Sequence, residues 1–295
     1  MAKSSLKSEK FIELIMILCS LISVLTTLGI ILVLSIDTVK FFAEVSFIEF
    51  ITDTQWTPLF EDKHFGILPL LSGTVLTTLI ATTLAVPVGV SIAVYLNEYA
   101  STNFTAIVKP ILEVLAAVPT VVYGFFALQF VTPLLQTFIP TLAGFNALSP
   151  GIVMGIMIIP YITSLSEDAL RAVPKSLREA SYGLGANKLQ TAFKVMVPAA
   201  SSGIVVSIVL AVSRALGETM IVAIAAGQQP NLTMNPLESV ETITTYIVQV
   251  SMGDVPQDSL EYRTIFAAGI TLFAFTFLLN NISYWIQKKY QNRYD

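Results

Sequence analysis

The stretch DALRAVPKSLREASYGLGANKLQTAFKVMVP, residues 168–198, is the only long polar interruption in the second half of a very apolar chain. It carries five of the sixteen Lys and Arg residues: Arg171, Lys175, Arg178, Lys188 and Lys194. A basic segment between two apolar runs is typical of a loop on the inner side of a membrane. The stretch therefore predicts a cytoplasmic loop that joins two membrane spans.

The first half of this loop is predicted to form a short helix. Pro174 lies where a first helical turn tolerates proline, and Ser176 and Glu179 have the spacing of a capping box. Gly183 and Gly185 would end this helix.

The second half of the loop predicts another helix that begins at Asn187. Gln190 follows three residues later, and Pro198 stops the helix. The loop as a whole is predicted to be helix, glycine turn, helix.

The composition of the chain is that of an integral membrane protein. Hydrophobic residues make up 54% and charged residues 12% of the sequence, whereas soluble domains carry about 25% charged residues. The mean hydropathy of +0.75 agrees with this. A length of 295 residues leaves room for about six spans of ~20 residues. These numbers predict an all-α integral membrane protein with a single membrane domain.

Several kinds of chemistry are excluded by residue types that the sequence lacks. The single cysteine, Cys19, allows no disulfide within the chain and no cysteine-based metal cluster. The single histidine, His64, is predicted to be a solvated loop residue. No phosphate-binding P-loop is present, so any use of ATP requires a partner. We therefore expect no catalytic residues, no metal site and no cofactor in this chain.

Six apolar runs are long enough to span a membrane. Their approximate ranges are 11–36, 66–96, 106–135, 150–165, 199–227 and 264–286. Small residues along the second run predict a face for close helix packing, and Pro87 and Gly89 predict a kink or break in it. In the third run, Glu113 is predicted to form an ion pair with Lys109 near the inner end.

The distribution of charge sets the orientation. With both termini inside, twelve of the sixteen Lys and Arg residues lie on the inner side and eleven of the twenty acidic residues on the outer side. This satisfies the positive-inside rule. The predicted division is a cytoplasmic segment 1–10, a transmembrane domain 11–287 with outer segments at about 37–65 and 228–261, and a cytoplasmic tail 288–295.

The two outer segments are predicted to hold interfacial helices. Apolar residues recur at roughly helical spacing in the first segment: Phe41, Phe42, Val45, Ile48 and Ile51. Residues 243–252 predict a second such helix. Trp56 near the start of a span is predicted to be an interface anchor.

Arg214 and Glu218 form a charged pair inside the fifth span. Their spacing of four predicts that they share one helix face. An Arg at mid-depth costs about 2.5–3.5 kcal/mol on insertion scales, so the pair should face a polar cavity or a partner chain. Arg suits an oxyanion because its planar fork donates two parallel hydrogen bonds. Glu218 would orient Arg214 and accept a proton from protonated phosphate; the alternative is a salt bridge that only fixes helix packing.

The loop resembles the EAA coupling loop of ABC importer permeases. Glu179-Ala180-Ser181, three residues, Gly185, nine residues and Val195-Met196-Val197-Pro198 follow that pattern, with departures at Ser181, Val195 and Val197. The resemblance implies the type I permease fold with six transmembrane helices. It also implies that the loop docks in a groove of a separate ATPase through Arg178, Glu179, Ala180, Ser181, Gly185, Lys188 and Pro198.

Four further motifs resemble phosphate-specific permeases of that family. They are Arg-Ala-Leu-Gly-Glu-Thr at 214–219, Phe-Gly-Ile-Leu-Pro at 65–69, Ala-Val-Pro-Thr-Val-Val-Tyr-Gly at 117–124 and Ser-Glu-Asp-Ala-Leu at 166–170. The long first outer segment is more similar to the PstC-type subunit than to its PstA-type partner. The resemblance implies a phosphate pathway at Arg214, Glu218 and Thr219.

The same resemblance implies the surroundings of the chain. A second permease of the PstA type would complete the pathway. Two ATPase subunits of the PstB type would bind ATP and magnesium, and a soluble phosphate-binding protein of the PstS type would deliver the substrate. The expected location is a bacterial inner membrane, in contact with lipid and not with nucleic acid, with both termini in the cytoplasm.

Three alternatives remain open at this point. The same machine could carry another oxyanion such as molybdate or sulfate. The chain could instead be an ion-coupled transporter or channel that works alone, with Arg214 and Glu218 as a relay. A membrane scaffold or sensor is the third class.

Overall fold

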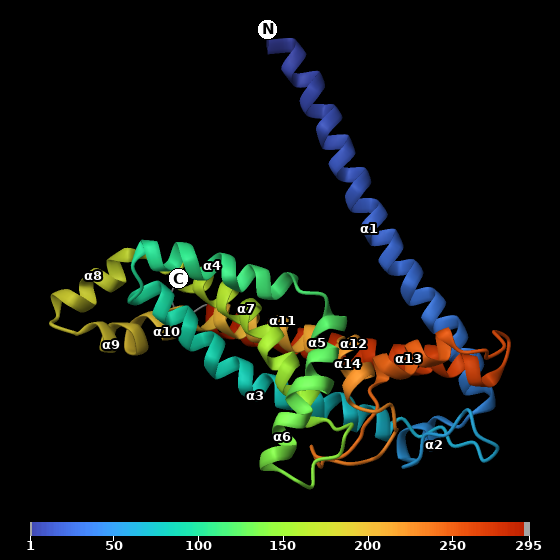
Figure 1. Cartoon of the computed structure of the whole chain (residues 1–295). Helices are drawn as coiled ribbons and strands as arrows, with labels where there is room; N and C mark the ends of the chain where they lie inside the picture. Colours follow the sequence, from blue (N-terminus) through green and yellow to red (C-terminus); the bar gives the residue numbers. More distant parts are fainter. Residues whose placement is uncertain (1, 292–295) are drawn as a thin grey trace.

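The computed structural model describes residues 2–291, and within them it contains helices and loops but no β-strand (Figure 1). The helices are, in order, α1 Ala2–Glu44, α2 Phe47–Thr52, α3 Leu68–Glu98, α4 Thr102–Ala117, α5 Thr120–Phe126, the π-helix η1 Ala127–Val131, α6 Thr132–Phe138, α7 Leu148–Ala172, α8 Lys175–Gly183, α9 Lys188–Thr191, the π-helix η2 Ala192–Met196, α10 Val197–Ala199, α11 Ser201–Leu216, α12 Met220–Ala225, α13 Ile243–Met252 and α14 Leu260–Gln291.

Five stretches of helix are long and apolar enough to cross a membrane. They are Lys10–Glu44, Leu68–Glu98, Thr120–Phe138, Leu148–Ala172 and Leu260–Trp285. A sixth span exists if Lys188–Ala199 and Ser201–Leu216, which are bent by 71° relative to each other, count as one. The predicted all-α, multi-span architecture is therefore confirmed.

The third span was predicted with the wrong limits. The expected continuous run 106–135 is divided, because α4 ends at Ala117 and Val118 takes an extended conformation before Pro119. The residue before a proline disfavours the helical conformation, which explains the break. The span itself begins at Thr120. The predicted break at Pro87 and Gly89 is absent, because α3 continues through both residues.

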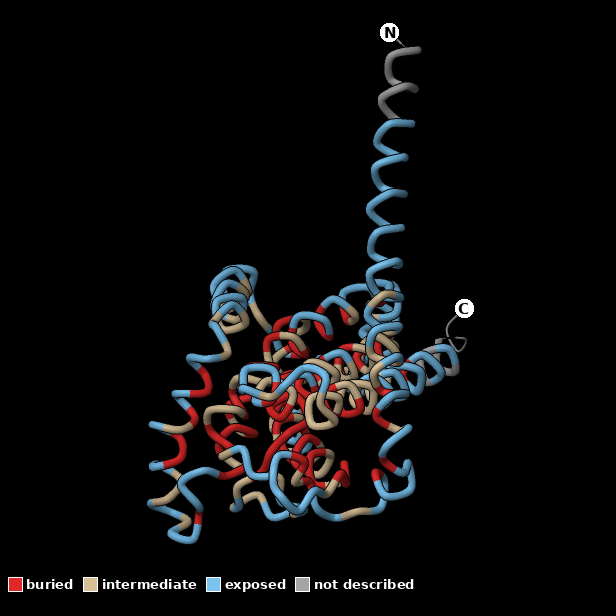
Figure 2. Tube along the Cα trace, turned by 90° about the vertical axis from the view of Figure 1, so that its right-hand side faces the viewer, coloured by how far each residue is buried: buried red, intermediate tan, exposed pale blue. Residues whose placement is uncertain are grey.

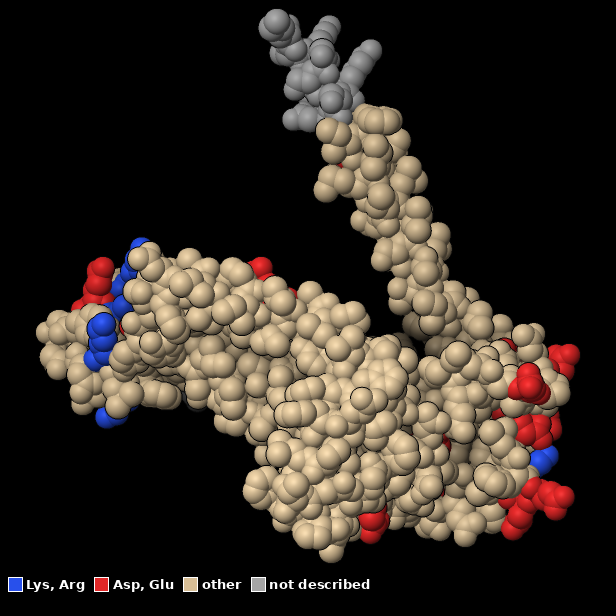
Figure 3. Space-filling view, in the orientation of Figure 1, with Lys and Arg blue, Asp and Glu red and all other residues tan. Residues whose placement is uncertain are grey.

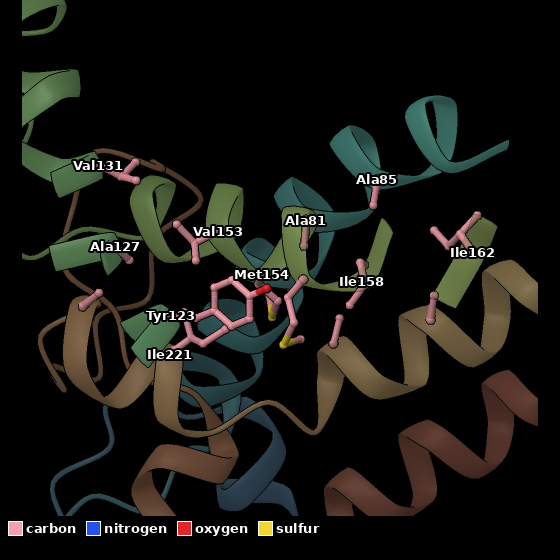
Figure 4. Close-up of a cluster of buried hydrophobic side chains, with 14 residues drawn as sticks. Ala81, Ala85, Tyr123, Ala127, Val131, Val153, Met154, Ile158, Ile162 and Ile221 are labelled. Atoms are coloured by element: carbon pink, nitrogen blue, oxygen red, sulfur yellow. The ribbon is translucent and has the colours of Figure 1, made fainter. Parts of the chain in front are cut away.

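The centre of the molecule is the packing of α3 against α7. Of the small residues predicted to form a packing face, Gly73, Thr74, Thr77 and Ala81 are buried and Thr83 is exposed. Gly73 and Thr74 lie against residues 240–243 of the outer segment, and Ala81 lies against α7. On α7, a Cβ at Gly151 would lie 2.8 Å from Ile80 of α3. Ala81 and Ala85 of α3 belong to the central cluster with Met154 and Ile158 of α7 and Tyr123 of α5 (Figure 4). Close approach of the two helices thus fixes the frame of the fold.

The outer end is closed by aromatic packing rather than by interfacial helices. Trp56 was predicted to be an interface anchor, but it is 2% exposed and packs edge-on against Phe50 and Tyr246. Of the predicted apolar stripe, Phe41 is fully buried at the end of α1, whereas Ile48 is 69% exposed. Helix α13 exists where it was predicted, but it packs into this cluster through α14 and α3.

His64 lies in the loop as predicted, with its side chain 33% exposed, and it is also paired. Its Nδ1 lies 2.8 Å from Oδ2 of Asp53. This hydrogen bond raises the pKa of His64 above its ordinary value. The Asp53–His64 contact therefore fixes the loop that precedes α3.

Helix α1 stands apart from the rest of the molecule over most of its length (Figures 1 and 2). Its apolar side chains between Phe11 and Leu28 are exposed, and only its last part packs along α14. A helix that is apolar all round requires lipid or another protein around it. The burial pattern therefore fits a membrane span at the periphery of the bundle.

Candidate functional site

The coupling loop lies at one end of the molecule, opposite to the end formed by α2 and α13 (Figure 1). Its two predicted helices are present as α8 and α9. The capping box predicted at Asn187 is confirmed: Asn187 Oδ1 accepts from the Gln190 amide at 2.9 Å, and Gln190 Oε1 accepts from the Asn187 amide at 3.0 Å. The capping box predicted at Ser176 and Glu179 is wrong, because α8 begins at Lys175 after Pro174 and has no side-chain cap.

The turn between α8 and α9 depends on a glycine. Gly185 has φ of +84°, a conformation that side chains with a Cβ rarely adopt. Ser181 of α8 is buried and shares a hydrogen bond of 2.9 Å with Thr191 of α9. These two residues therefore set the angle of the loop. The predicted stop at Pro198 is wrong by a small margin, since α10 continues to Ala199.

The motif residues of the loop divide into two groups. Glu179, Ala180, Gly185 and Lys188 are exposed, whereas Arg178 and Ser181 point into the protein and Pro198 is half-buried. The loop also exposes five large apolar side chains, those of Leu177, Tyr182, Leu184, Leu189 and Phe193. Leu184 is 90% exposed. Basic side chains gather at the same end, while most of the acidic ones lie at the opposite end (Figure 3). Large apolar side chains that are exposed next to charged ones are typical of a protein interface.

The charged pair of the fifth span does not share the predicted helix face, and the alternative salt bridge is not formed either. Helix α11 ends at Leu216 and α12 starts at Met220, so Arg214 and Glu218 do not share a continuous helix face. Gly217 separates them and caps α11. No ion pair joins the two side chains in the described chain. The prediction assumed an unbroken helix, which the glycine interrupts.

Arg214 instead lies over an aromatic ring. Its guanidinium carbon is 4.5 Å from the centre of the Tyr161 ring of α7. Its Nε is buried and has no hydrogen-bond partner within the described residues. A cation held on a ring keeps its edge free for hydrogen bonds, because the ring contacts only the face of the guanidinium. The Nε–H of Arg214 is therefore a buried donor without an acceptor among the described residues.

Glu218 and Thr219 shape the break between α11 and α12. Glu218 is 8% exposed, and its Oε1 accepts from the amides of Met220 at 3.2 Å and Ile221 at 3.4 Å. Its main-chain oxygen accepts from Thr244 Oγ1 at 2.9 Å, which ties the break to α13. The Thr219 hydroxyl donates to Gly217 at 3.3 Å. Glu218 thus caps a helix rather than orienting Arg214.

Sequence reasoning missed the carboxylate that joins α4 to α7. Glu167 is 1% exposed, and its two oxygens lie 2.7 Å from Lys109 Nζ and 2.7 Å from Arg171 Nη2. The predicted pair of Lys109 with Glu113 is wrong, because Lys109 turns to Glu167. The spacing of four between Glu167 and Arg171 was a signal that pointed to this site.

A cavity of about 310 Å³ opens beside this carboxylate. Its lining includes Lys109, Glu113, Glu167 and Tyr161, the residue whose ring carries Arg214. Tyr161 therefore contacts both the cavity and Arg214. Within the described residues no three acidic, histidine or cysteine side chains form a possible metal site.

Comparison with known proteins identifies the class of protein that this fold and site define. The family described as "binding-protein-dependent transport system inner membrane component" matches residues 85–294. The chain belongs to this family of membrane permeases.

Individual relatives agree with the family. The chain is 35% identical over 268 residues to the probable ABC transporter permease protein YqgH of Bacillus subtilis, with 90% of this chain and 86% of that one covered. It is 32% identical over 252 residues to the phosphate transport system permease protein PstC of Mesorhizobium japonicum, with 78% and 75% covered. The resemblance to PstC-type permeases that the sequence motifs indicated is thereby confirmed.

Solved structures support the fold. A bacterial alginate ABC transporter in complex with a pentasaccharide-bound periplasmic protein matches with a TM-score of 0.64 and 18% identity, covering 95% of this chain and 96% of that one. The MetNI methionine ABC transporter in an inward-facing conformation matches with a TM-score of 0.56 and 16% identity, covering 76% and 94%. The predicted ABC importer permease fold is therefore confirmed.

Proposed function

We propose that this chain is the PstC-type permease subunit of an ATP-driven importer of inorganic phosphate. The observation that carries the proposal is its similarity, over most of its length, to relatives named phosphate transport system permease proteins. As a permease the chain performs no covalent chemistry. A second permease of the PstA type completes the pathway, and a PstS-type protein delivers phosphate from outside.

The exposed coupling loop is the docking site for the ATPase subunits. The exposed apolar side chains of the loop, with the exposed Glu179 and Lys188, supply the two features that such an interface needs, apolar surface and charged groups. Two PstB-type subunits hold ATP and magnesium, and their closure moves α8 and α9. The loop then lies in the cytoplasm, and both termini are on that side.

Arg214 is the residue of this chain that meets phosphate in the pathway. Tyr161 supports the face of its guanidinium, and its Nε has no acceptor among the described residues. An oxyanion accepts two parallel, charge-assisted hydrogen bonds from such a group. Glu218 and Thr219 border the pathway at the break after α11, where they hold the backbone in position.

The test is uptake of labelled phosphate in cells that lack this chain. Wild type, Arg214→Gln and the matched control Arg263→Gln are supplied, with membrane levels of each protein measured. Arg263 pairs with Glu44 at the outer end, away from the proposed pathway. We expect wild type and the control to restore uptake that unlabelled phosphate alone inhibits. Arg214→Gln should reach the membrane and restore less than a tenth of it.

Three results would contradict the proposal. If molybdate or sulfate competes as well as phosphate, the substrate assignment is wrong. If Arg214→Gln transports normally, Arg214 only fixes helix packing on Tyr161. Uptake that persists without any ATPase subunit would instead favour a transporter that works alone.

A further inference from the structure

The inner end of α3 holds a buried ion pair with the coupling loop. Glu98, the last residue of α3, has a side chain that is 2% exposed. Its Oε1 accepts from Arg178 Nη2 of α8 at 2.7 Å and from Asn97 Nδ2 at 2.7 Å. The two partners are 80 residues apart in the sequence. A charge removed from water in this way is held only where a specific partner compensates it.

Helix α8 has few other attachments to the membrane bundle. Ser181 is its one buried residue, and the hydroxyl of Ser181 bonds to Thr191 within the loop itself. The bond from Arg178 to Glu98 is the only side-chain hydrogen bond from α8 to a spanning helix within the described residues. The neighbouring contact is weaker: Lys188 Nζ lies 5.9 Å from the centre of the Tyr99 ring, one residue beyond α3.

Helix α3 connects this ion pair to the opposite end of the molecule. It is one helix of 31 residues, about 46 Å long at 1.5 Å per residue. Near its outer end the Thr74 hydroxyl accepts from the Ile243 amide at 3.0 Å. The next residue, Thr244, donates to the main chain of Glu218 at the break in the fifth span. A displacement of α3 along its axis would therefore reach the break beside Arg214.

We propose that Arg178 is a positioning residue that passes the movement of the ATPase-docked loop to α3 through Glu98, rather than a residue that contacts the ATPase. This role rests on the proposed function of the loop as the ATPase docking site. Arg178 faces inward to Glu98, while the exposed Glu179 and Lys188 remain available to the partner. Movement at α8 is thus tied to α3 by a bond whose carboxylate is buried, while the Arg178 side chain is 30% exposed.

The experiment compares transport with ATP hydrolysis in the full importer reconstituted in vesicles. The variants are Glu98→Gln, Arg178→Lys and the exchanged pair Glu98→Arg with Arg178→Glu. The control is Glu44→Gln, which removes the carboxylate of an exposed ion pair at the outer end. Phosphate uptake and ATP hydrolysis are measured together, with and without the phosphate-loaded binding protein, and subunit content is quantified.

We expect Glu98→Gln to retain the ATPase subunits and basal hydrolysis but to move at least tenfold less phosphate per ATP. The exchanged pair should recover at least half of the wild-type ratio, and the control should equal wild type. A purely structural role would lower subunit content and leave the ratio unchanged in the complexes that form. If Glu98→Gln does not assemble, the phosphate moved per ATP is measured in Arg178→Lys and in the exchanged pair, and these two variants test the proposal.

The proposal is overturned if the single variants that assemble, Glu98→Gln or Arg178→Lys, keep the wild-type ratio. It is also overturned if the exchanged pair assembles with normal subunit content and remains uncoupled. Wild type tests the proposed function separately. If it moves another oxyanion with ATP, only the substrate assignment fails and the ratio is measured with that ion. If it transports without ATP, the docking function of the loop fails and Arg178 has no such role.

Discussion

The two ends of the molecule bury carboxyl groups in opposite ways. At the inner end, Glu98 and Glu167 are almost fully buried, and each lies 2.7 Å from a cation supplied by another helix: Arg178 of α8 for Glu98 and Lys109 of α4 for Glu167. At the outer end, Glu241 is 2% exposed and forms no ion pair among the described residues.

The inner end joins its helices by ion pairs, whereas the outer end is closed by packing. A buried ion pair loses much of its stabilisation when one partner leaves, so it keeps two elements together while each side chain can swing. The outer end uses aromatic packing around Trp56 and close backbone contact instead, which tolerates little displacement. Burial also raises the pKa of the Glu241 carboxyl to about 8, which favours its neutral form. The buried carboxylates that have a cation partner therefore lie where α4, α8 and the spans meet.

The strongest way to break the comparison is Arg178→Met. The substitution preserves much of the volume but leaves the Glu98 carboxylate buried without a cation. Removal of one partner of a buried pair costs about 3–5 kcal/mol. We expect the free energy of unfolding in detergent to fall by that amount. Lys188→Met is the matched control, because Lys188 is exposed and makes only a ring contact. Equal losses of unfolding free energy in the two variants would mean that the Arg178–Glu98 pair stabilises the protein no more than an exposed lysine does.

At the outer end, the largest loss is expected from Gly73→Ala. A Cβ at Gly73 of α3 would overlap the carbonyl oxygen of Glu241, and backbone cannot move aside as a flexible side chain can. Overpacking of this kind costs about 1–3 kcal/mol. Gly29→Ala in α1 is the control, since nothing lies within 4 Å of its Cβ position. Thermal denaturation of both variants measures the difference; a stable Gly73→Ala would mean that the outer end can shift.

Local features of the fold could be predicted from the sequence, whereas contacts between distant residues could not. The spans, the helix-turn-helix loop and the packing face of α3 follow from local patterns of apolar, small and capping residues. The contacts of Glu98 with Arg178 and of Glu167 with Lys109 do not, because the partners lie 80 and 58 residues apart along the chain (178 − 98 and 167 − 109). Such pairs form only after the helices have packed.

Two errors had local signals that were given too little weight. Gly217 ends α11 between Arg214 and Glu218, and the rule that residues four apart share a face holds only within a continuous helix. Pro119 likewise separates α4 from α5. For Trp56, the interface preference of tryptophan was overridden by the aromatic cluster of the outer end, which no local pattern predicts.

The pH dependence of stability sharpens the comparison at Glu241. Its carboxyl has a pKa of about 8 in the folded protein against 4.5 for the ordinary group. Between these values the folded state holds a proton that the unfolded chain releases, so stability falls as pH rises and becomes constant above about 8. The slope is about 1.4 kcal/mol per pH unit. We expect wild type to lose about 2 kcal/mol relative to Glu241→Gln between pH 6 and pH 7.5. Parallel curves for the two proteins would show that Glu241 is ionised in both states.

The smallest effect is expected for Lys109→Met at the inner end. Arg171 remains 2.7 Å from Glu167, so the buried carboxylate keeps one cation and the loss should be about 1 kcal/mol. Arg171→Met alone should lower the free energy of unfolding by a similar amount, because Lys109 then remains beside Glu167. The double variant leaves Glu167 without a cation and should lose about 3–5 kcal/mol, more than the sum of the two single losses. A double-mutant cycle of unfolding free energies measures this excess. Additive losses would mean that water already compensates Glu167, and the inner end would then hold its helices by packing, as the outer end does.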